Sequence, residues 1–535
     1  MKNIILLLTS FFLSTGLVAQ SNPLPEGTKS LINYKKLRTL QYEKTNLGRI
    51  SNNNAEKGHK ITLTCETLTH PDKIYSLATR IPIWSKNVAS EQIIFLSFQA
   101  RTLEASLETD EAKVLWQLNV SDRPKDRQRS TISMSHVWQE YFVPFKVDKS
   151  IQAKNLRLTM QYGFPPQKFE IKKLRLHLLP EGTDMATLPK TQITYGGMEA
   201  DAAWRKPAAE RIEKHRKGNF TLHVTKKGKP VTDLPIQVKL KRHNFAWGAA
   251  FNAKDMIADS KHLDFFSGAF NIGVFENDLK IKFWNKEGRQ ERVFEAIDNL
   301  SARDVDLKGH VLIWPGFRHL TPAFKKNKGN PEKLESMIQE HLDDILKATK
   351  GKISRWDVVN ETRANQDLQR ITGSEEILFN GFRELHRRDP QVLRYTNEYG
   401  IINRGGLNVK NREEYYNYIK RMDENTGGLV DGIGIQSHIG SDLTPIEKVL
   451  EILDYYATLD KKISISEFTM DIKDPEVRTA YTGDFMTAAF SHPQVFEFLF
   501  WGYQTEKADI FTENWNAGSM GDACLLYTSP SPRDS

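Results

Sequence analysis

The chain has 535 residues, of which 39% are hydrophobic and 10% aromatic, and it carries a formal net charge of +8. This length favours two or three domains, and the apolar content excludes a wholly disordered chain. Basic and acidic residues are interspersed without a dominant Lys/Arg block, so the charge predicts a soluble surface and no nucleic-acid partner. Only two cysteines are present, Cys65 and Cys524, which excludes a disulfide framework and a cysteine-based zinc site.

The first twenty residues have the pattern of a signal peptide. Lys2 supplies the positive start, residues 4–18 are mostly apolar, and Ala19 offers a small side chain for cleavage. This apolar stretch is too short and too interrupted for a membrane-spanning helix, and no later stretch is long enough. We therefore expect a secreted or periplasmic protein with no membrane partner.

Residues 21–180 are predicted to form a β-sandwich, because short alternating strands follow one another without long helical periods. Examples of the expected strands are 61–64, 93–98, 114–118, 141–145, 156–160 and 174–178. Stretches 137–145 and 169–176 resemble strands of jelly-roll carbohydrate-binding modules. Trp84, Trp116 and Trp138 suit either stacking on a sugar ring or packing in the core, and we expect core positions.

A change of period after residue 245 predicts a second domain. Residues 181–204 contain Gly, Pro and Thr and are predicted to be a linker, followed by a charged helix at 208–216. Two strand-like runs, 220–224 and 236–240, flank a turn at 228–230. Eight strands then alternate with helical stretches such as 331–349 and 412–425, which predicts a (β/α)₈ barrel within residues 205–523. The expected strands are 245–251, 274–277, 307–314, 355–361, 393–399, 432–438, 463–468 and 496–502.

Two glutamates, Glu361 and Glu467, end the fourth and seventh of these strands. In a parallel barrel the carboxyl ends of all strands meet at one face, which is where chemistry takes place. Two carboxyl groups that face one bond are what glycoside hydrolysis requires. The alternative is an ordinary pair of surface carboxylates at strand ends.

Six short motifs lie at predicted strand ends, in chain order. They are ENDLK at 276–280, GHVLIW at 309–314, WDVVNE at 356–361, DGIGIQSH at 431–438, SEF at 466–468 and WG at 501–502. Together they resemble glycoside hydrolase family 10, the endo-β-1,4-xylanases, over about residues 205–516. The resemblance implies a retaining mechanism in which Glu467 is the nucleophile and Glu361 is the general acid and then the base.

The resemblance also implies a set of supporting and substrate-binding residues. Asn360 would bind the 2-hydroxyl of the sugar at the cleavage point. The alternative is that its side chain only caps the end of the strand. His438 would hydrogen-bond the nucleophile, and Gln436 lies two positions earlier on the same strand face. Two alternatives stay open for the other implied residues: Trp314 also suits the core, and Glu276 with Lys280 could form a structural ion pair. The remaining implied sugar contacts are Glu276, Asn277, Lys280, His310, Trp314 and Trp501.

Four departures from the family pattern spare the catalytic pair but leave the glycan specificity open. Thr469 stands where an Asp commonly supports the histidine, so the orientation of His438 is either looser or supported by Asp471 instead. The other departures are Pro315 in place of a second histidine, Glu398 and Gly400 in place of Asp and Asn beside a retained Asn397, and no second tryptophan in 502–507.

The end of the chain is unusual for a barrel. A closing helix should follow the last strand, but Pro530, Pro532 and the neighbouring serines disfavour helix. We expect the closing helix to be missing and residues 524–535 to be a non-native tail. The apolar backs of the first and last strands would then be exposed.

The leading hypothesis is a monomeric endo-β-1,4-xylanase that acts on xylan. No cofactor and no metal are expected, because the His, Asp and Glu residues lack the spacing of a ligand set. One alternative is a retaining hydrolase of another β-linked glycan. Another is a secreted glycan-binding protein without turnover, which the intact glutamate pair argues against.

Overall fold

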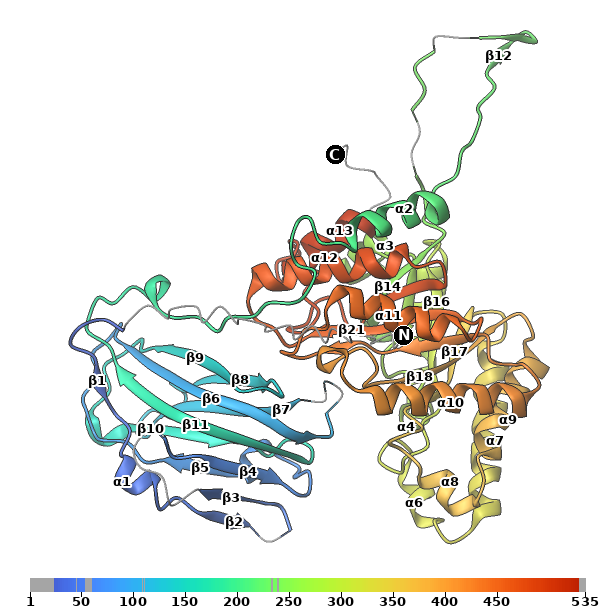
Figure 1. The fold of residues 1–535 in the computed structure, drawn as a ribbon. Coiled ribbons are helices and arrows are strands. Elements are labelled where there is room, and N and C mark those ends of the chain that lie inside the picture. The colour runs from blue at the N-terminus through green and yellow to red at the C-terminus, as the bar shows by residue number, and fades with distance from the viewer. Residues whose placement is uncertain are drawn as a thin grey trace, which may run out of the picture.

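The computed structural model describes residues 24–528, except 45, 53–59, 108, 110, 232–233 and 238–239. The predicted signal peptide therefore lies outside the described residues. An antiparallel β domain and a parallel α/β barrel stand side by side, each with its own hydrophobic core (Figure 1). No helix among the described residues has the length and apolar character needed to cross a membrane.

The N-terminal domain is a sandwich of two antiparallel sheets, which confirms the predicted β-rich region. One sheet has the order β2-β3-β4-β11-β6-β9, with β1 paired to β11, and the other has the order β5-β10-β7-β8. The strands are β1 (Lys29–Ser30), β2 (Tyr42–Lys44), β3 (Gly48–Asn52), β4 (Leu63–Thr67), β5 (Ala78–Ile81), β6 (Ile93–Ala105), β7 (Ala112–Val120), β8 (Gln128–Met134), β9 (Gln139–Lys146), β10 (Leu156–Gln161) and β11 (Gln167–Leu178).

Strand β11 shows why the sandwich pattern is hard to follow in the sequence. Phe169 and Ile171 face the core at odd positions, whereas Leu174, Leu176 and Leu178 face it at even positions. A bulge between Lys172 and Arg175 shifts the pairing with β6, and Lys173 within it has a φ of 49°. The extra residue reverses which positions face the core, from odd to even numbers. The apolar side chains of both halves of the strand therefore face the same core.

The three sandwich tryptophans have different environments. Trp116 is fully buried in the core, as expected. Trp138 lies under two cations, with Lys172 Nζ 3.7 Å and Arg101 Cζ 4.8 Å from its ring centroid. Trp84 is 52% exposed, so for this residue the expected core position is wrong.

The second domain is a closed barrel of parallel strands, as predicted. The order β19-β18-β17-β16-β15-β14-β22-β21 closes through the pairing of β19 with β21, and β20 lies beside β21 at the rim. The predicted sixth strand is split into β19 and β20 because Ser437 takes a left-handed φ of 61°. The strands are β14 (Ala246–Phe251), β15 (Ile272–Phe275), β16 (Asp306–Ile313), β17 (Arg355–Asn360), β18 (Leu393–Glu398), β19 (Gly432–Ile435), β20 (His438–Ile439), β21 (Lys462–Met470) and β22 (Val495–Phe500).

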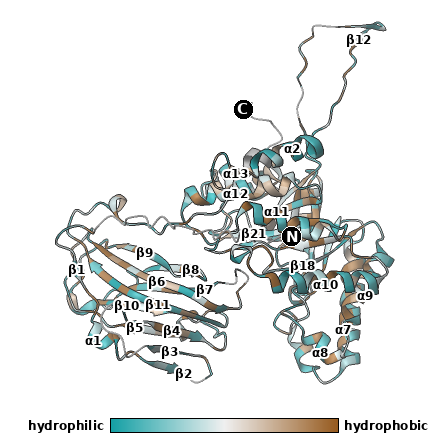
Figure 2. Cartoon of the chain, viewed as in Figure 1, coloured by the Kyte–Doolittle hydropathy of each residue, from teal (hydrophilic) through white to brown (hydrophobic). Residues whose placement is uncertain are grey.

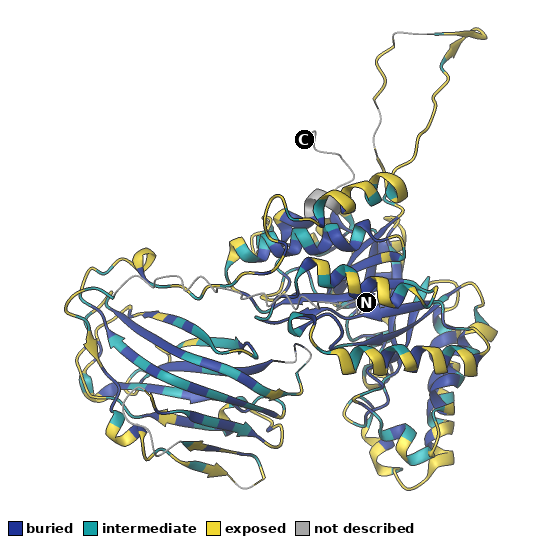
Figure 3. Ribbon diagram, viewed as in Figure 1, coloured by how far each residue is buried: buried dark blue, intermediate teal, exposed yellow. Residues whose placement is uncertain are grey.

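Amphipathic helices cover the outside of the barrel, with apolar sides inward and exposed sides outward (Figures 2 and 3). Helix α7 begins at Pro331, its Asn330 cap accepts a hydrogen bond from the Lys333 backbone, and its buried residues recur every three or four positions. The larger helices are α2 (Arg205–Arg216), α3 (Lys261–Ala269), α5 (Arg289–Ser301), α7 (Pro331–Thr349), α9 (Glu376–Arg388), α10 (Val409–Thr426), α11 (Ile446–Ala457), α12 (Pro475–Ser491) and α13 (Ser519–Thr528).

Two predictions about secondary structure are wrong. Residues 220–224 do not form a strand; only β12 (Thr225–Lys226) and β13 (Lys229–Pro230) pair, at the tip of an extended arm (Figure 1). The other run, 236–240, lies partly outside the described residues. The closing helix is present: α13 packs on α12, and Met520 and Cys524 are buried. The described part of the helix reaches Thr528, and Pro530 and Pro532 come after it in the sequence.

The barrel interior contains buried charges. Lys308 Nζ lies 3.1 Å from Asp357 Oδ1 and 2.9 Å from Glu497 Oε1, and all three side chains are at most 2% exposed. Arg355 makes a second ion pair with Glu497 at 2.8 Å. Burial disfavours the ionised form of Glu497, but Lys308 and Arg355 outweigh it and lower its pKa to about 2.

Candidate active site

The two predicted catalytic glutamates lie at the same end of the barrel. Glu361 directly follows β17 and Glu467 lies in the last half of β21; each is 4% exposed. The Glu361 backbone N–H donates to Asn397 O and the Glu467 N–H donates to Gln436 O, which extends the sheet pairing to the catalytic positions. Glu361 has a left-handed φ of 52°, a strained conformation for a non-glycine residue that is commonest at functional sites.

A chain of three side-chain amides joins the two carboxyl groups. Gln436 Nε2 donates to Glu361 Oε1 at 3.1 Å and to Asn360 Oδ1 at 3.2 Å. Asn397 Nδ2 donates to the same Asn360 oxygen at 3.1 Å and to Glu467 Oε1 at 2.6 Å. All five side chains are buried. Both glutamates therefore belong to one hydrogen-bond network, as the barrel prediction required.

The second oxygen of Glu361 faces a different set of partners. Asn365 Nδ2 donates to Glu361 Oε2 at 3.1 Å, and Arg318 Nη2 lies 3.9 Å from the same oxygen. The Arg318 side chain is 66% exposed, so this cation sits at the solvent side of the site. Exposure screens its charge, and we expect the pair to be weak.

His438 is fixed between Glu467 and a threonine. Its Nε2 is 3.2 Å from Glu467 Oε2 and its Nδ1 is 2.8 Å from Thr469 Oγ1. Thr469 thus holds the imidazole itself. The suggested substitute, Asp471, instead pairs with Lys113 of the sandwich at 2.6 Å. The idea that Asp471 supports His438 is therefore wrong.

Two tryptophans and a histidine line the neighbouring part of the same face. The His310 ring lies 5.1 Å from Trp501 and 6.1 Å from Trp314, centroid to centroid, and its Nδ1 is 2.9 Å from Asp357 Oδ2. Lys280 Nζ is 5.0 Å from the Trp314 ring and 5.9 Å from the Trp501 ring. The predicted aromatic contacts therefore converge.

The acidic and amide residues of the second strand complete this corner. Glu276 follows β15 and accepts a 3.0 Å hydrogen bond from Asn252 Nδ2 at Oε2. Lys280 Nζ donates to Asn277 Oδ1 at 3.1 Å. Glu276, Asn277 and Lys280 are each partly exposed, and so they have surface left for a ligand.

Several residues of the site were not singled out as functional from the sequence. His319 stacks on Trp314 with centroids 3.4 Å apart and rings inclined by 7°. Burial, followed by the charge of Arg318, lowers the pKa of His319 to about 3, so a neutral ring covers the tryptophan. Asn397 gave a signal as the retained residue of the fifth strand, and Asp357 lies inside the WDVVNE motif without having been assigned a role. Asn365 and His319 gave no signal beyond their closeness to a motif.

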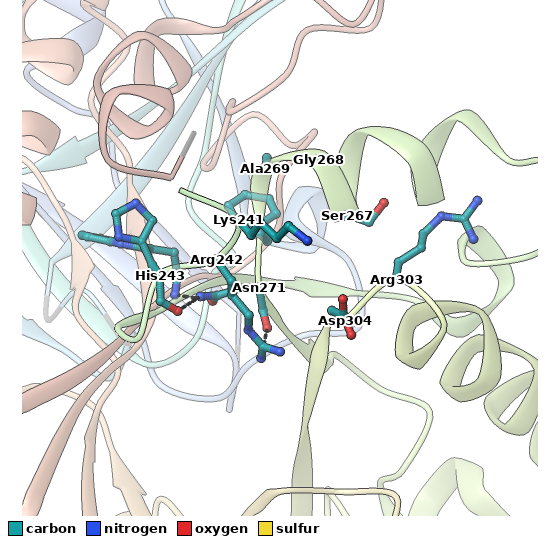
Figure 4. A pocket seen from close by; sticks show the side chains of 11 residues that line it. Lys241, Arg242, His243, Ser267, Gly268, Ala269, Asn271, Arg303 and Asp304 are labelled. Carbon is teal, nitrogen blue, oxygen red and sulfur yellow. Dashed lines mark hydrogen bonds between the residues drawn. The ribbon is translucent and has the colours of Figure 1, made fainter. Parts of the chain in front are cut away.

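A separate cavity of about 140 Å³ lies at the opposite end of the barrel (Figure 4). Its lining includes Trp247 at the start of β14 and Asn271 just before β15, so it belongs to the amino-terminal face. Lys241, Arg242 and Arg303 make it basic, but neither catalytic glutamate lines it. Conserved chemistry in barrels of this type lies at the carboxyl-terminal face, and we place the active site there.

A protein-family profile matches most of the barrel domain. The sequence profile described as "Glycosyl hydrolase family 10" matches residues 236–531. The chain belongs to glycosyl hydrolase family 10. The match begins in the arm before the barrel and includes the motifs around Glu361 and Glu467, which confirms the resemblance inferred from the sequence.

The relatives of this family 10 chain are distant. Endo-1,4-beta-xylanase 1 of Arabidopsis thaliana is 29% identical over 273 residues, which is 50% of this chain and 28% of the relative. The anti-sigma-I factor RsgI6 of Acetivibrio thermocellus is 26% identical over 64% of this chain and 44% of its own length. The chain thus spans less than half the length of these two relatives. A crystal structure of xylanase 10B from Thermotoga petrophila with xylobiose is 22% identical, with a TM-score of 0.47, over 55% of this chain and 98% of that one.

Proposed function

We propose that this family 10 protein is an endo-β-1,4-xylanase that cleaves internal linkages of xylan with retention of configuration. The observation that carries the proposal is the amide network that ties Glu361 and Glu467 to one another at the carboxyl-terminal face. A retaining mechanism needs two carboxyl groups about 5–5.5 Å apart that can act on one glycosidic linkage.

In the first step Glu467 attacks the anomeric carbon and Glu361 gives its proton to the leaving oxygen. Asn397 and His438 hold the two oxygens of Glu467, one each, and so they fix the attack direction. The Asn360 oxygen is already taken by two donors, and its NH₂ group is therefore the part that suits a sugar 2-hydroxyl.

In the second step Glu361, now ionised, removes a proton from water, and that water releases the sugar from Glu467. Gln436 and Asn365 donate to the two oxygens of Glu361 and stabilise it as the carboxylate that this step needs. Trp314 and Trp501 supply apolar ring faces for the sugar next to the cleavage point.

Release of reducing sugar from xylan, with β-glucan and mannan as controls, tests the substrate class. Preference for either control over xylan would favour the alternative of another β-linked glycan, and no release from any polymer would favour a glycan-binding protein. The Glu467→Ala variant should lose at least about 10⁴-fold in kcat. Activity within tenfold of the parent would rule out the assigned nucleophile.

The Glu361→Ala variant separates the two roles. With an aryl glycoside whose leaving group needs no proton, the first step should continue and the glycosyl-enzyme should accumulate. Azide should then restore turnover and yield the β-glycosyl azide, because a small anion can replace the water that Glu361 activates. The exposed Glu340→Gln variant is the matched control and should leave turnover unchanged.

We also propose that the chain is exported, on the strength of the pattern in residues 1–20, and that it works as a monomer. Expression of the full chain followed by N-terminal sequencing of the extracellular or periplasmic fraction tests the first point. A mature N-terminus near residue 21 is the expected result. Size-exclusion chromatography with light scattering tests the second, with a single species of one chain mass expected.

A further inference from the structure

The sandwich touches the barrel at the ends of β20 and β21, the strands that carry His438 and Glu467. Glu111, immediately before β7, accepts hydrogen bonds from the Ser441 N–H at 2.7 Å, the Ser441 hydroxyl at 3.0 Å and the Asp442 N–H at 2.6 Å. Both oxygens of this fully buried carboxyl group are used. Ser135, just after β8, hydrogen-bonds the Asp442 carboxylate in return, so the contact is reciprocal.

A second contact lies beside the first. Lys113 Nζ of β7 is 2.6 Å from Asp471 Oδ2, and both side chains are only 10% exposed. Asp471 follows β21 directly, and the Ser133 hydroxyl of β8 lies 3.5 Å from the same oxygen. The ends of β7 and β8 thus contact the chain after β20 and after β21 (Figure 1).

The barrel backbone is shaped to receive Glu111. Gly440 has no side chain, and a Cβ at this position would lie 2.3 Å from the Glu111 carboxyl carbon. Any larger residue would push the carboxyl group away from the Ser441 and Asp442 N–H groups. The linker is also held on the barrel, because Tyr195 donates to Asp484 of α12 at 2.9 Å, and Arg205 at the start of α2 pairs with the same carboxylate at 2.7 Å.

Both contacts involve residues that lie close in sequence to His438 or to its hydrogen-bond partner Thr469. Ser441 is three residues after His438, which contacts Glu467, and Asp471 is two residues after Thr469, which contacts His438 Nδ1. The Asp471 N–H also donates to Ile439 O at 2.9 Å, so the two segments are bonded to each other. The sandwich therefore contacts both of the strand ends that set the position of the His438 imidazole.

We propose that Glu111 and Lys113 of the sandwich are positioning residues for the nucleophile of the barrel, acting through the segments 440–442 and 469–471 on His438. The proposal rests on the proposed function for its kinetic consequence. It makes the sandwich a part of the catalytic unit, in addition to any glycan binding. It also gives the Lys113–Asp471 pair a reason to be buried between domains, where an ion pair alone adds little stability.

The test uses the full chain and a 2-fluoro-xylobioside with a dinitrophenolate leaving group, which traps Glu467 covalently. The variants are Lys113→Ala, Asp471→Ala, their double variant, Lys113→Arg and Glu111→Gln. We expect Lys113→Ala and Glu111→Gln to slow the trapping step about tenfold with little change in the concentration for half-maximal rate, because small misplacement of a reacting group is costly. Lys113→Arg should recover most of the rate, and the double variant should match the single variants because the pair acts as one unit.

The control breaks a different ion pair of the same domain. Glu170→Gln removes the 2.8 Å pair with Arg101 on the sandwich, and it should trap at the parent rate. If the Lys113 and Glu111 variants also trap at the parent rate, or lose only affinity, the proposal is overturned. A loss of the same size in Glu170→Gln would overturn it too, since general destabilisation would then explain the effect.

A second readout does not depend on turnover. The ¹³C–¹H signal of His438 in histidine-labelled protein, assigned from its loss in His438→Gln, reports the environment of the imidazole. We expect Lys113→Ala and Glu111→Gln to shift it and Glu170→Gln to leave it unchanged. If the parent does not react with the trapping reagent, the proposed function fails, whereas the histidine signal still decides the positioning role.

Discussion

The Asn397 side chain donates a 2.6 Å hydrogen bond to Oε1 of Glu467, the oxygen that His438 does not contact. Both residues are buried, and the second contact of the Asn397 amide N–H group is Asn360. Asn397 comes from the fifth strand and Glu467 from the seventh, so only barrel closure brings them together.

Replacement of Asn397 by Ala should lower kcat/KM on an aryl xylobioside about 10- to 100-fold. The reason is the loss of a hydrogen bond to a charged group, worth about 1.5–3 kcal/mol, which here orients the nucleophile. Asn271→Ala is the matched control, because Asn271 donates only to backbone carbonyls at the other end of the barrel. It should reduce stability and leave kcat unchanged. Equal kinetic losses in both variants would contradict the assigned role.

Thr469→Val should reduce kcat about fivefold, whereas Thr469→Ser should stay close to the parent. Valine keeps the shape of threonine but removes the hydroxyl that contacts His438 Nδ1, and a net loss of about 1 kcal/mol is typical for one hydrogen bond. Steady-state kinetics of the two variants provide the measurement. A serine variant as slow as the valine variant would show that the methyl group, and not the hydroxyl, matters.

Lys308→Met should lower the free energy of unfolding of the barrel by about 3–5 kcal/mol, because Glu497 and Asp357 would then lose their shared buried cation. Urea unfolding followed by tryptophan fluorescence measures the change. Lys333→Met, at an exposed pair with Glu340, is the control and should alter stability by no more than about 0.5 kcal/mol. A small effect of Lys308→Met would mean that Arg355 alone can balance both carboxylates.

The docking contact at Glu111 should make stability depend on pH. Burial, and then the charge of Asp442, raise the pKa of Glu111 from 4.5 to about 8, and Tyr141 also faces this carboxyl group. Between these pH values the folded state binds more protons than the unfolded state, so stability falls as pH rises, by at most about 1.4 kcal/mol per pH unit from this group.

Unfolding of the parent and of Glu111→Gln at a series of pH values between 4.5 and 8 isolates this contribution. The glutamine amide cannot ionise, so the free energy of unfolding of the variant should fall less steeply with rising pH than that of the parent. Parallel curves for the two proteins would show that Glu111 titrates with an ordinary pKa in the folded state.

The barrel could be predicted because short, mostly apolar strand-like runs alternate with longer helical periods after residue 245. Helix α7 was predicted with its observed bounds, since Pro331 and the Asn330 cap mark its start. Strand β8 was missed, because its polar sequence QRSTISM has no alternation strong enough to indicate a strand. The closing helix α13 was missed because the prolines after it were given too much weight.

The sequence by itself determined the chemistry of the site: which residues are acids, amides and aromatic rings, and that they follow strands of a parallel barrel. Only the tertiary structure decided which of them touch. Thr469 and not Asp471 holds His438, and Asp471 turns to Lys113 of the sandwich. The physical reason is that hydrogen-bond partners are set by distances of about 3 Å between groups far apart in the chain, and local pattern carries no information on such distances.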